Sequence, residues 1–227
     1  MTQALDAALD VFWRKGYEGA SYKDLTQATG VARPALYSAF GNKEALFRLA
    51  LERYYTHYTA FYPAALELPT SREVAAHILR NAVELNTRDP ERTGCLAIHG
   101  VLAGSDDAEP VRRALIEARV AAEATLRERF ERAKREGDLP ADANCAALAA
   151  YVSAVTHGMA VQAKAGYDRE VLNAVADQAL STWPGSDRSS SKQSRGRSRQ
   201  ALACAAPPPL APVPPVGKRQ PARKRHA

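Results

Sequence analysis

The sequence has few cysteines. Its 227 residues hold three, Cys95, Cys145 and Cys204, which are odd in number and far apart. A framework of disulfides is therefore not expected, and a reducing cytoplasm is the compartment that fits. No apolar run approaches the length of a membrane span, and polar residues interrupt the first ten positions. We therefore expect neither a membrane anchor nor a secretory signal.

Runs of valine, isoleucine and threonine of the kind that form strands are also scarce, whereas alanine and leucine dominate. This composition favours an all-α protein. The first helix should end at Gly16, and the second should be capped by Ser21 and end at Gly30. Leu25 and Ala28 are expected to form the buried side of the second helix. Further helices, separated by proline and glycine, fill the chain as far as residue 183.

The sequence lacks the motifs of common enzymes. It contains no G-x-S-x-G, no P-loop and no G-x-G-x-x-G, so no enzyme and no catalytic residue is predicted. Cys95 and His99 lie four residues apart, a spacing that could hold a metal or pair a thiolate with a base. Two ligands do not make a tetrahedral site, however, and no others are spaced nearby. We therefore predict no metal and no cofactor.

Positive charge is concentrated at one end of the chain. Residues 184–227 carry ten Lys/Arg and one acid, a net charge of +9, while the other 183 residues carry 21 bases and 24 acids. This segment is rich in serine, arginine and proline, cannot bury a core, and should be disordered. It could add non-specific affinity for DNA through counterion release, or it could be a dispensable extension.

The most informative stretch is ASYKDLTQATGVARPALYSAFGNKEAL, residues 20–46, which has the pattern of a helix-turn-helix. In such a unit the second helix of the pair enters the major groove. If Leu36 and Phe40 face the core, the opposite side of that helix faces outward, and Arg33 lies at its start. Arg33 is the best candidate for bidentate contact to guanine. The predicted DNA-binding residues are Ser21, Tyr22, Arg33, Pro34, Ala35, Tyr37, Ser38 and Lys43.

Helix pairs with a glycine turn are common, so these residues could also be ordinary surface positions of a small bundle. Residues 1–48 hold six bases and five acids. Any DNA contact must therefore come from individually placed residues and not from a generally basic face.

The N-terminal signature YEGASYKDLTQATGVARPALYSAFGNKEALF resembles that of the TetR/AcrR family of bacterial transcriptional regulators. The resemblance covers about the first fifty residues, and TGCLAIHG (93–100) is similar to a segment in one branch of the family. It implies about nine helices, three of them in a DNA-binding head and the last two in a four-helix dimer interface. The position before Arg33 is often Ser or Thr in the family but is Ala32 here, so the reading helix should lack a side-chain cap.

Three parts of the chain are predicted from these features. Residues 1–48 form the head, with the helix-turn-helix motif at about 22–41. Residues 49–183 form a helical ligand-binding and dimerisation domain, and residues 184–227 form the disordered basic tail.

The second part is expected to hold a pocket for a small apolar or aromatic ligand, although its aromatic residues could equally be core and interface packing. The predicted ligand-binding residues are Tyr58, Phe61, Tyr62, His77, Cys95, His99 and Tyr151. The predicted dimer-interface residues are Tyr151, Val155, Met159, Leu172, Val175 and Ala179.

These features together predict a cytoplasmic, homodimeric transcriptional regulator that binds a roughly palindromic operator in double-stranded DNA. A repressor released by its ligand is the favoured form. The alternatives are an activator, a regulator that needs no ligand, or an all-α small-molecule-binding protein or enzyme with a degenerate head.

Overall fold

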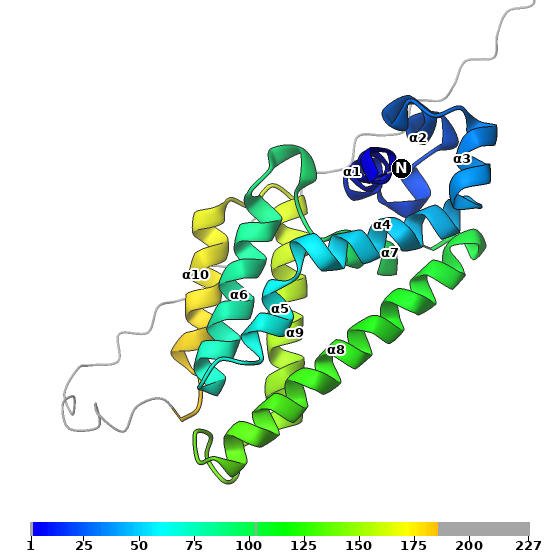
Figure 1. Ribbon diagram of the computed structural model, residues 1–227. Helices are drawn as coiled ribbons and strands as arrows, with labels where there is room; N and C mark the ends of the chain where they lie inside the picture. The colour runs from blue at the N-terminus through cyan, green and yellow to red at the C-terminus, as the bar shows by residue number, and fades with distance from the viewer. Residues whose placement is uncertain (1, 103, 186–227) are drawn as a thin grey trace, which may run out of the picture. The chain divides into compact units, whose positions relative to one another are not determined.

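The computed structural model describes residues 2–102 and 104–185 (Figure 1). Within them the protein is all-α, with ten α-helices and two short 3-10 helices. The helices are α1 (Thr2–Gly19), α2 (Tyr22–Thr29), α3 (Arg33–Phe40), α4 (Lys43–Tyr58), α5 (Phe61–Ala65), α6 (Ser71–Thr87), α7 (Leu96–Val101), α8 (Glu109–Arg135), α9 (Cys145–Lys164) and α10 (Arg169–Ser181). The 3-10 helices are η1 (Pro90–Arg92) and η2 (Asp106–Ala108). The all-α prediction is confirmed, and the helix beyond the expected nine is the five-residue α5. The predicted disorder beyond Gly185 lies outside the described residues.

Local sequence explains the boundaries of the first helices. Gly16 adopts φ 71° and ψ 175°, so α1 kinks there, and a short helical segment continues to Gly19. The Ser21 hydroxyl accepts from the Asp24 N–H at 3.1 Å, while the Asp24 carboxylate accepts from the Ser21 N–H at 3.0 Å. This reciprocal pair satisfies two backbone donors at the start of α2. Gly30 ends α2 with φ 68°, in the left-handed region that favours glycine.

The head is held by a small apolar core between α1, α2, α3 and α4. Leu25, Leu36 and Phe40 are buried in it, and the Phe12 ring packs edge-on against Phe47 of α4 at a centroid distance of 5.0 Å. Ala28, by contrast, is exposed, so the expectation that it is buried is wrong.

The core of the head continues without a break into the next helices. Tyr54 of α4, Leu96 of α7 and Leu115 of α8 belong to the same buried cluster as Phe12 and Leu36. The helices that follow α5 form most of a second buried cluster, in which α6 and α9 pack together and α8 and α10 cover them (Figure 1). The prediction of a domain boundary at residue 48 stays a prediction.

Among the described helices, α9 alone is long and apolar enough, by length and composition, to cross a membrane, with a mean hydropathy of 1.2. This corrects the expectation that no apolar run approaches a membrane span. The helix packs against α6, α8 and α10, and core helices of soluble proteins have the same composition, so it is weak evidence of a span.

Candidate nucleic-acid interface and ligand cavity

The outward face of α3 carries the side chains that the sequence predicted there. Arg33, Pro34, Ala35 and Ser38 are exposed, and Tyr37 is 36% exposed, whereas Leu36 is buried. Ala32 occupies the N-cap position in an extended conformation and makes no side-chain hydrogen bond to the helix. The backbone N–H groups at the start of α3 therefore lack a side-chain acceptor from that position.

Three of the predicted DNA-binding residues contact one another. The Arg33 guanidinium lies over the Tyr22 ring, 4.3 Å from its centroid, and its Nη2 donates to the Tyr37 hydroxyl at 3.3 Å. The two tyrosine rings lie 5.2 Å apart. Hydrogen bonds from Tyr22 and then Arg33 lower the pKa of Tyr37. The aromatic faces orient the Arg33 guanidinium before any partner arrives.

Ser21 and Lys43 lie at the starts of α2 and α4. The Ser21 hydroxyl donates to Asp24 at 2.7 Å as well as capping α2, so it is already engaged. The Lys43 ammonium lies 4.7 Å from the centroid of the Tyr17 ring. Burial lowers the pKa of Lys43, and the negative charges of Glu18 and Asp107 partly offset this by raising it. Both residues flank α3, and Lys43 is half-buried whereas Arg33 is exposed.

A cavity of about 560 Å³ lies between α4, α6, α8 and α9. Its wall is mainly apolar and aromatic. Of the predicted ligand-binding residues, Phe61, Tyr62 and Cys95 line it, and they are joined by Tyr54, Tyr55, Ile78, Ala82, Leu85, Asn86, Ile98, Arg119, Ala122, Thr156 and His157 among others. Burial raises the pKa of Tyr55 and Tyr62 to about 12, so both hydroxyls keep their protons at neutral pH. This volume lies within the range of pockets that hold small organic molecules.

The other four predicted ligand-binding residues do not line this cavity. Tyr58 packs edge-on against Trp13 at 4.9 Å, and His99 lies against Gly94. His77 is half-buried on α6, and Tyr151 is exposed on α9. These four residues lie outside the cavity because helical spacing fixes the side of a helix and not which neighbour that side meets, and the ligand site itself stays a prediction.

Two polar residues of the cavity, Arg119 and Asn86, were missed by the sequence analysis. Arg119, His157 and Asn86 line it, and Arg119 Nη2 donates to His157 Nδ1 at 2.8 Å. A signal for Arg119 was present in the sequence, because it lies at helical spacing between Leu115 and Ala122 on the apolar stripe of its helix. An arginine within such a stripe marks an inward-facing charge.

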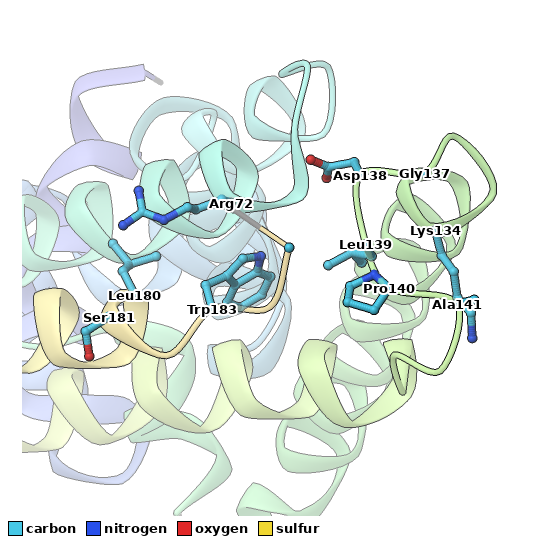
Figure 2. A pocket seen from close by; sticks show the side chains of 11 residues that line it. Arg72, Lys134, Gly137, Asp138, Leu139, Pro140, Ala141, Leu180, Ser181 and Trp183 are labelled. Atoms are coloured by element: carbon cyan, nitrogen blue, oxygen red, sulfur yellow. The ribbon is translucent and has the colours of Figure 1, made fainter. Parts of the chain in front are cut away.

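A second, wider hollow of about 1000 Å³ lies at the far end of the described fold. Figure 2 shows Leu180 and Trp183 on one side of it and Leu139 and Pro140 on the other. It is open, mixed in polarity, and bordered by Gly185, the last described residue. The cavity between α4, α6, α8 and α9, whose wall is mainly apolar, is the better candidate for an apolar ligand.

The predicted dimer residues divide into two groups. Tyr151 is 42% exposed, and Val155 and Val175 are partly exposed. Met159, Leu172 and Ala179 are buried in the second core cluster of the same chain. These three residues therefore face the core of their own chain, where α6 and α8 cover the inward halves of α9 and α10, and the dimer interface stays a prediction.

The candidate metal-ligating residues do not gather in the part of the chain that is described. No group of three His, Cys, Asp or Glu side chains there is placed to hold a metal ion. The Tyr54 hydroxyl donates to Cys95 Sγ at 3.2 Å, and His99 does not join that pair.

Comparison with known proteins identifies two matching regions. Residues 4–50 match the family described as bacterial regulatory proteins, tetR family, and residues 75–179 match a tetracyclin repressor-like C-terminal domain. The HTH-type transcriptional repressor ComR of Escherichia coli K12 is 31% identical over 183 residues, which cover 80% of this chain and 87% of ComR.

Solved structures agree with this match. A cysteine mutant of the TetR family regulator CifR, complexed with a 26-bp operator duplex, is 41% identical with a TM-score of 0.77, covering 81% of this chain and 96% of that one. A TetR regulator from Rhodococcus sp. RHA1 is 40% identical with a TM-score of 0.57, covering 81% and 98%. The helix-turn-helix head, the helical domain behind it and these similarities together show that the chain belongs to the TetR family of DNA-binding transcriptional regulators.

Proposed function

We propose that this protein is a cytoplasmic, homodimeric repressor that binds a roughly palindromic operator and is released from it by a small molecule. The observation that carries the proposal is the outward face of α3, where Arg33 is held by Tyr22 and Tyr37. ComR carries the name of a repressor, and the CifR structure contains operator DNA. The protein acts by binding and not by catalysis.

The proposed DNA contacts divide by chemistry. Arg33 has the planar donors that match guanine O6 and N7, and Pro34 and Ala35 offer apolar contact to a thymine methyl. Contacts to the phosphates of the DNA backbone are assigned to Tyr37, Ser38, Ser21, Tyr22 and Lys43. Such contacts fix the position of the head without reading sequence.

Pairing of two copies through α9 and α10 would place two heads on one face of the duplex. Exposed apolar side chains, Tyr151 and Val161 on α9 and Val171 on α10, support this assignment. A two-fold dimer reads two half-sites related by the same symmetry, which makes the operator palindromic.

The link between cavity and head is α4. Phe47, near its start, packs against Phe12 and Tyr17 of α1, whereas Tyr54 and Tyr55 line the cavity. A ligand that fits the cavity better in one position of α4 than in another would shift the spacing of the two heads. Residues 1–48 are assigned to DNA binding, and residues 49–183 are assigned to ligand binding and dimerisation.

The test is equilibrium binding to a duplex from the promoter beside the protein's own gene, with a scrambled duplex as reference. We expect Arg33→Ala to lose most of the preference for the promoter duplex, about 1–3 kcal/mol. Tyr37→Phe should weaken binding to both duplexes. Arg113→Ala, an exposed arginine on α8 paired only with Glu109, is the matched control. Unchanged specificity in Arg33→Ala would remove α3 as the reading helix.

A further inference from the structure

The cavity between α4, α6, α8 and α9 carries an uncompensated positive charge. Arg119 is half-buried in its wall and has no carboxylate partner among the ion pairs of the described residues. Its Nε is shielded from solvent and makes no hydrogen bond. Removing a guanidinium N–H from water without an acceptor costs free energy, so an acceptor supplied by a ligand would be favoured there.

His157 adds a second donor to the same place. A guanidinium can only donate, so the contact from Arg119 Nη2 at 2.8 Å makes His157 Nδ1 the acceptor. A neutral ring that accepts at Nδ1 carries its proton on Nε2. Burial, and then the charge of Arg119, lower the pKa of His157 to about 4, in keeping with a neutral ring. The pair therefore presents N–H donors and one positive charge.

The remaining wall of the cavity selects against other kinds of ligand. No aspartate or glutamate lines it, so nothing there would balance a cationic ligand. Tyr55, Phe61 and Ile98 provide an apolar surface for the body of a ligand. Asn86, 2% exposed, has a side-chain oxygen without a hydrogen-bond partner, which would accept one donor group.

We propose that the ligand of this cavity is an apolar monocarboxylic acid, whose carboxylate binds Arg119 and His157 and whose hydrocarbon or aromatic body fills the aromatic wall. This inference rests on the proposed ligand-released function and names the chemical class of its ligand. A carboxylate on a partly buried arginine forms charge-assisted hydrogen bonds, which are about twice as strong as neutral ones. A ligand of the same shape without the charge loses that part of the affinity.

The test uses three acids, 4-phenylbutyrate, 2-naphthoate and decanoate, each beside its primary amide, with the full-length protein and calorimetric titration. We expect at least one acid to bind about tenfold or more tightly than its amide. Arg119→Gln should abolish the preference for the acid, and Arg119→Lys should keep part of it. Arg113→Gln, an exposed arginine on the same helix, is the matched control.

Equal binding of acid and amide, or no heat from any of the three acids, would overturn the proposed ligand class. A preference for the acid that persists in Arg119→Gln would also overturn it. Melting curves show that each variant is folded; Arg119→Gln should fold at least as stably as the wild type, because it removes a poorly partnered charge. Operator binding is measured separately: an acid that binds at Arg119 without releasing DNA leaves this inference intact and contradicts ligand release.

Discussion

Arg129 is a buried charged residue whose side chain makes three hydrogen bonds. Its guanidinium donates to the carbonyl oxygens of Leu66 at 2.9 Å, Leu68 at 2.6 Å and Pro69 at 3.0 Å. These carbonyls belong to the turn between α5 and α6. Backbone acceptors replace part of the water that the guanidinium has lost, while its Nη1 is buried without a hydrogen-bond partner.

Arg129→Ala is therefore expected to destabilise the protein by about 2–4 kcal/mol, because it removes three hydrogen bonds and leaves the carbonyls of Leu68 and Pro69 without a side-chain donor; the Leu66 carbonyl keeps its bond from Arg132. Urea denaturation followed by circular dichroism measures the change. Arg135→Ala, an exposed arginine on the same helix, should change stability by less than about 0.5 kcal/mol. Equal effects of the two substitutions would show that the Arg129 contacts contribute nothing to stability.

His157 makes stability depend on pH. Its folded-state pKa, about 4, lies below the ordinary value of 6.5. Between these values the unfolded chain binds a proton that the folded chain does not, so stability falls as the pH falls from 6.5 towards 4. We expect a loss of about 1–2 kcal/mol in this window, reduced from the full value because the ring is partly exposed.

His157→Gln should remove this component, because glutamine can still accept from Arg119 but does not titrate. Thermal melts at pH 7 and pH 5 measure it. Burial also lowers the pKa of His99, but that residue is present in both proteins, so the difference between them isolates His157. Identical pH profiles would contradict a neutral, buried His157.

At the scale of elements, α3 is a short helix that begins without a side-chain cap. Ala32→Ser would place a hydroxyl at the N-cap in the extended conformation that capping residues adopt. We expect a gain of about 0.5–1 kcal/mol in stability, measured by thermal unfolding. Ala39→Ser, near the other end of the helix, is the control and should be neutral or slightly destabilising. A loss of stability in Ala32→Ser would show that the start of α3 is satisfied in another way.

The head could be predicted from sequence because its signals are local. Gly30, Pro34 and the spacing of Leu36 and Phe40 each fix a conformation or a face within a few residues. The contacts of Arg33 with Tyr22 could not be predicted, since they join two helices across a turn. The sequence therefore predicted where Arg33 lies but not that it contacts Tyr22.

The cavity and the pairing face were predicted less well for a physical reason. An apolar residue at helical spacing indicates burial, but a chain's own core, a ligand and a second copy all provide burial. Met159 and Leu172 pack inside the chain, whereas Tyr151 remains outside. Arg119, which the sequence analysis missed, would have been the better guide, because a charged residue within an apolar stripe needs a hydrogen-bonding or charged partner.

At the scale of the whole molecule, reading a palindromic operator requires two copies of this chain. Val161 on α9 is 48% exposed, and Val120 on α8 is 65% exposed. Val161→Glu should break a dimer formed through α9 and α10 and weaken operator binding, because a charge would be buried between two apolar faces. Val120→Glu is the matched control and should change neither. Sedimentation velocity distinguishes monomer from dimer by the sedimentation coefficient, and a Val161→Glu protein that remains dimeric would place the interface elsewhere.

The central claim is that Arg33 on α3 reads a guanine in the operator. The most direct measurement replaces each operator guanine in turn with 7-deazaguanine, which lacks the N7 acceptor, and compares the affinities of the wild type and Arg33→Ala. The account predicts that one substitution in each half-site weakens the wild type by about 1–3 kcal/mol and leaves Arg33→Ala unaffected. If no guanine shows this coupling, or if both proteins lose the same affinity at every position, Arg33 does not read the operator.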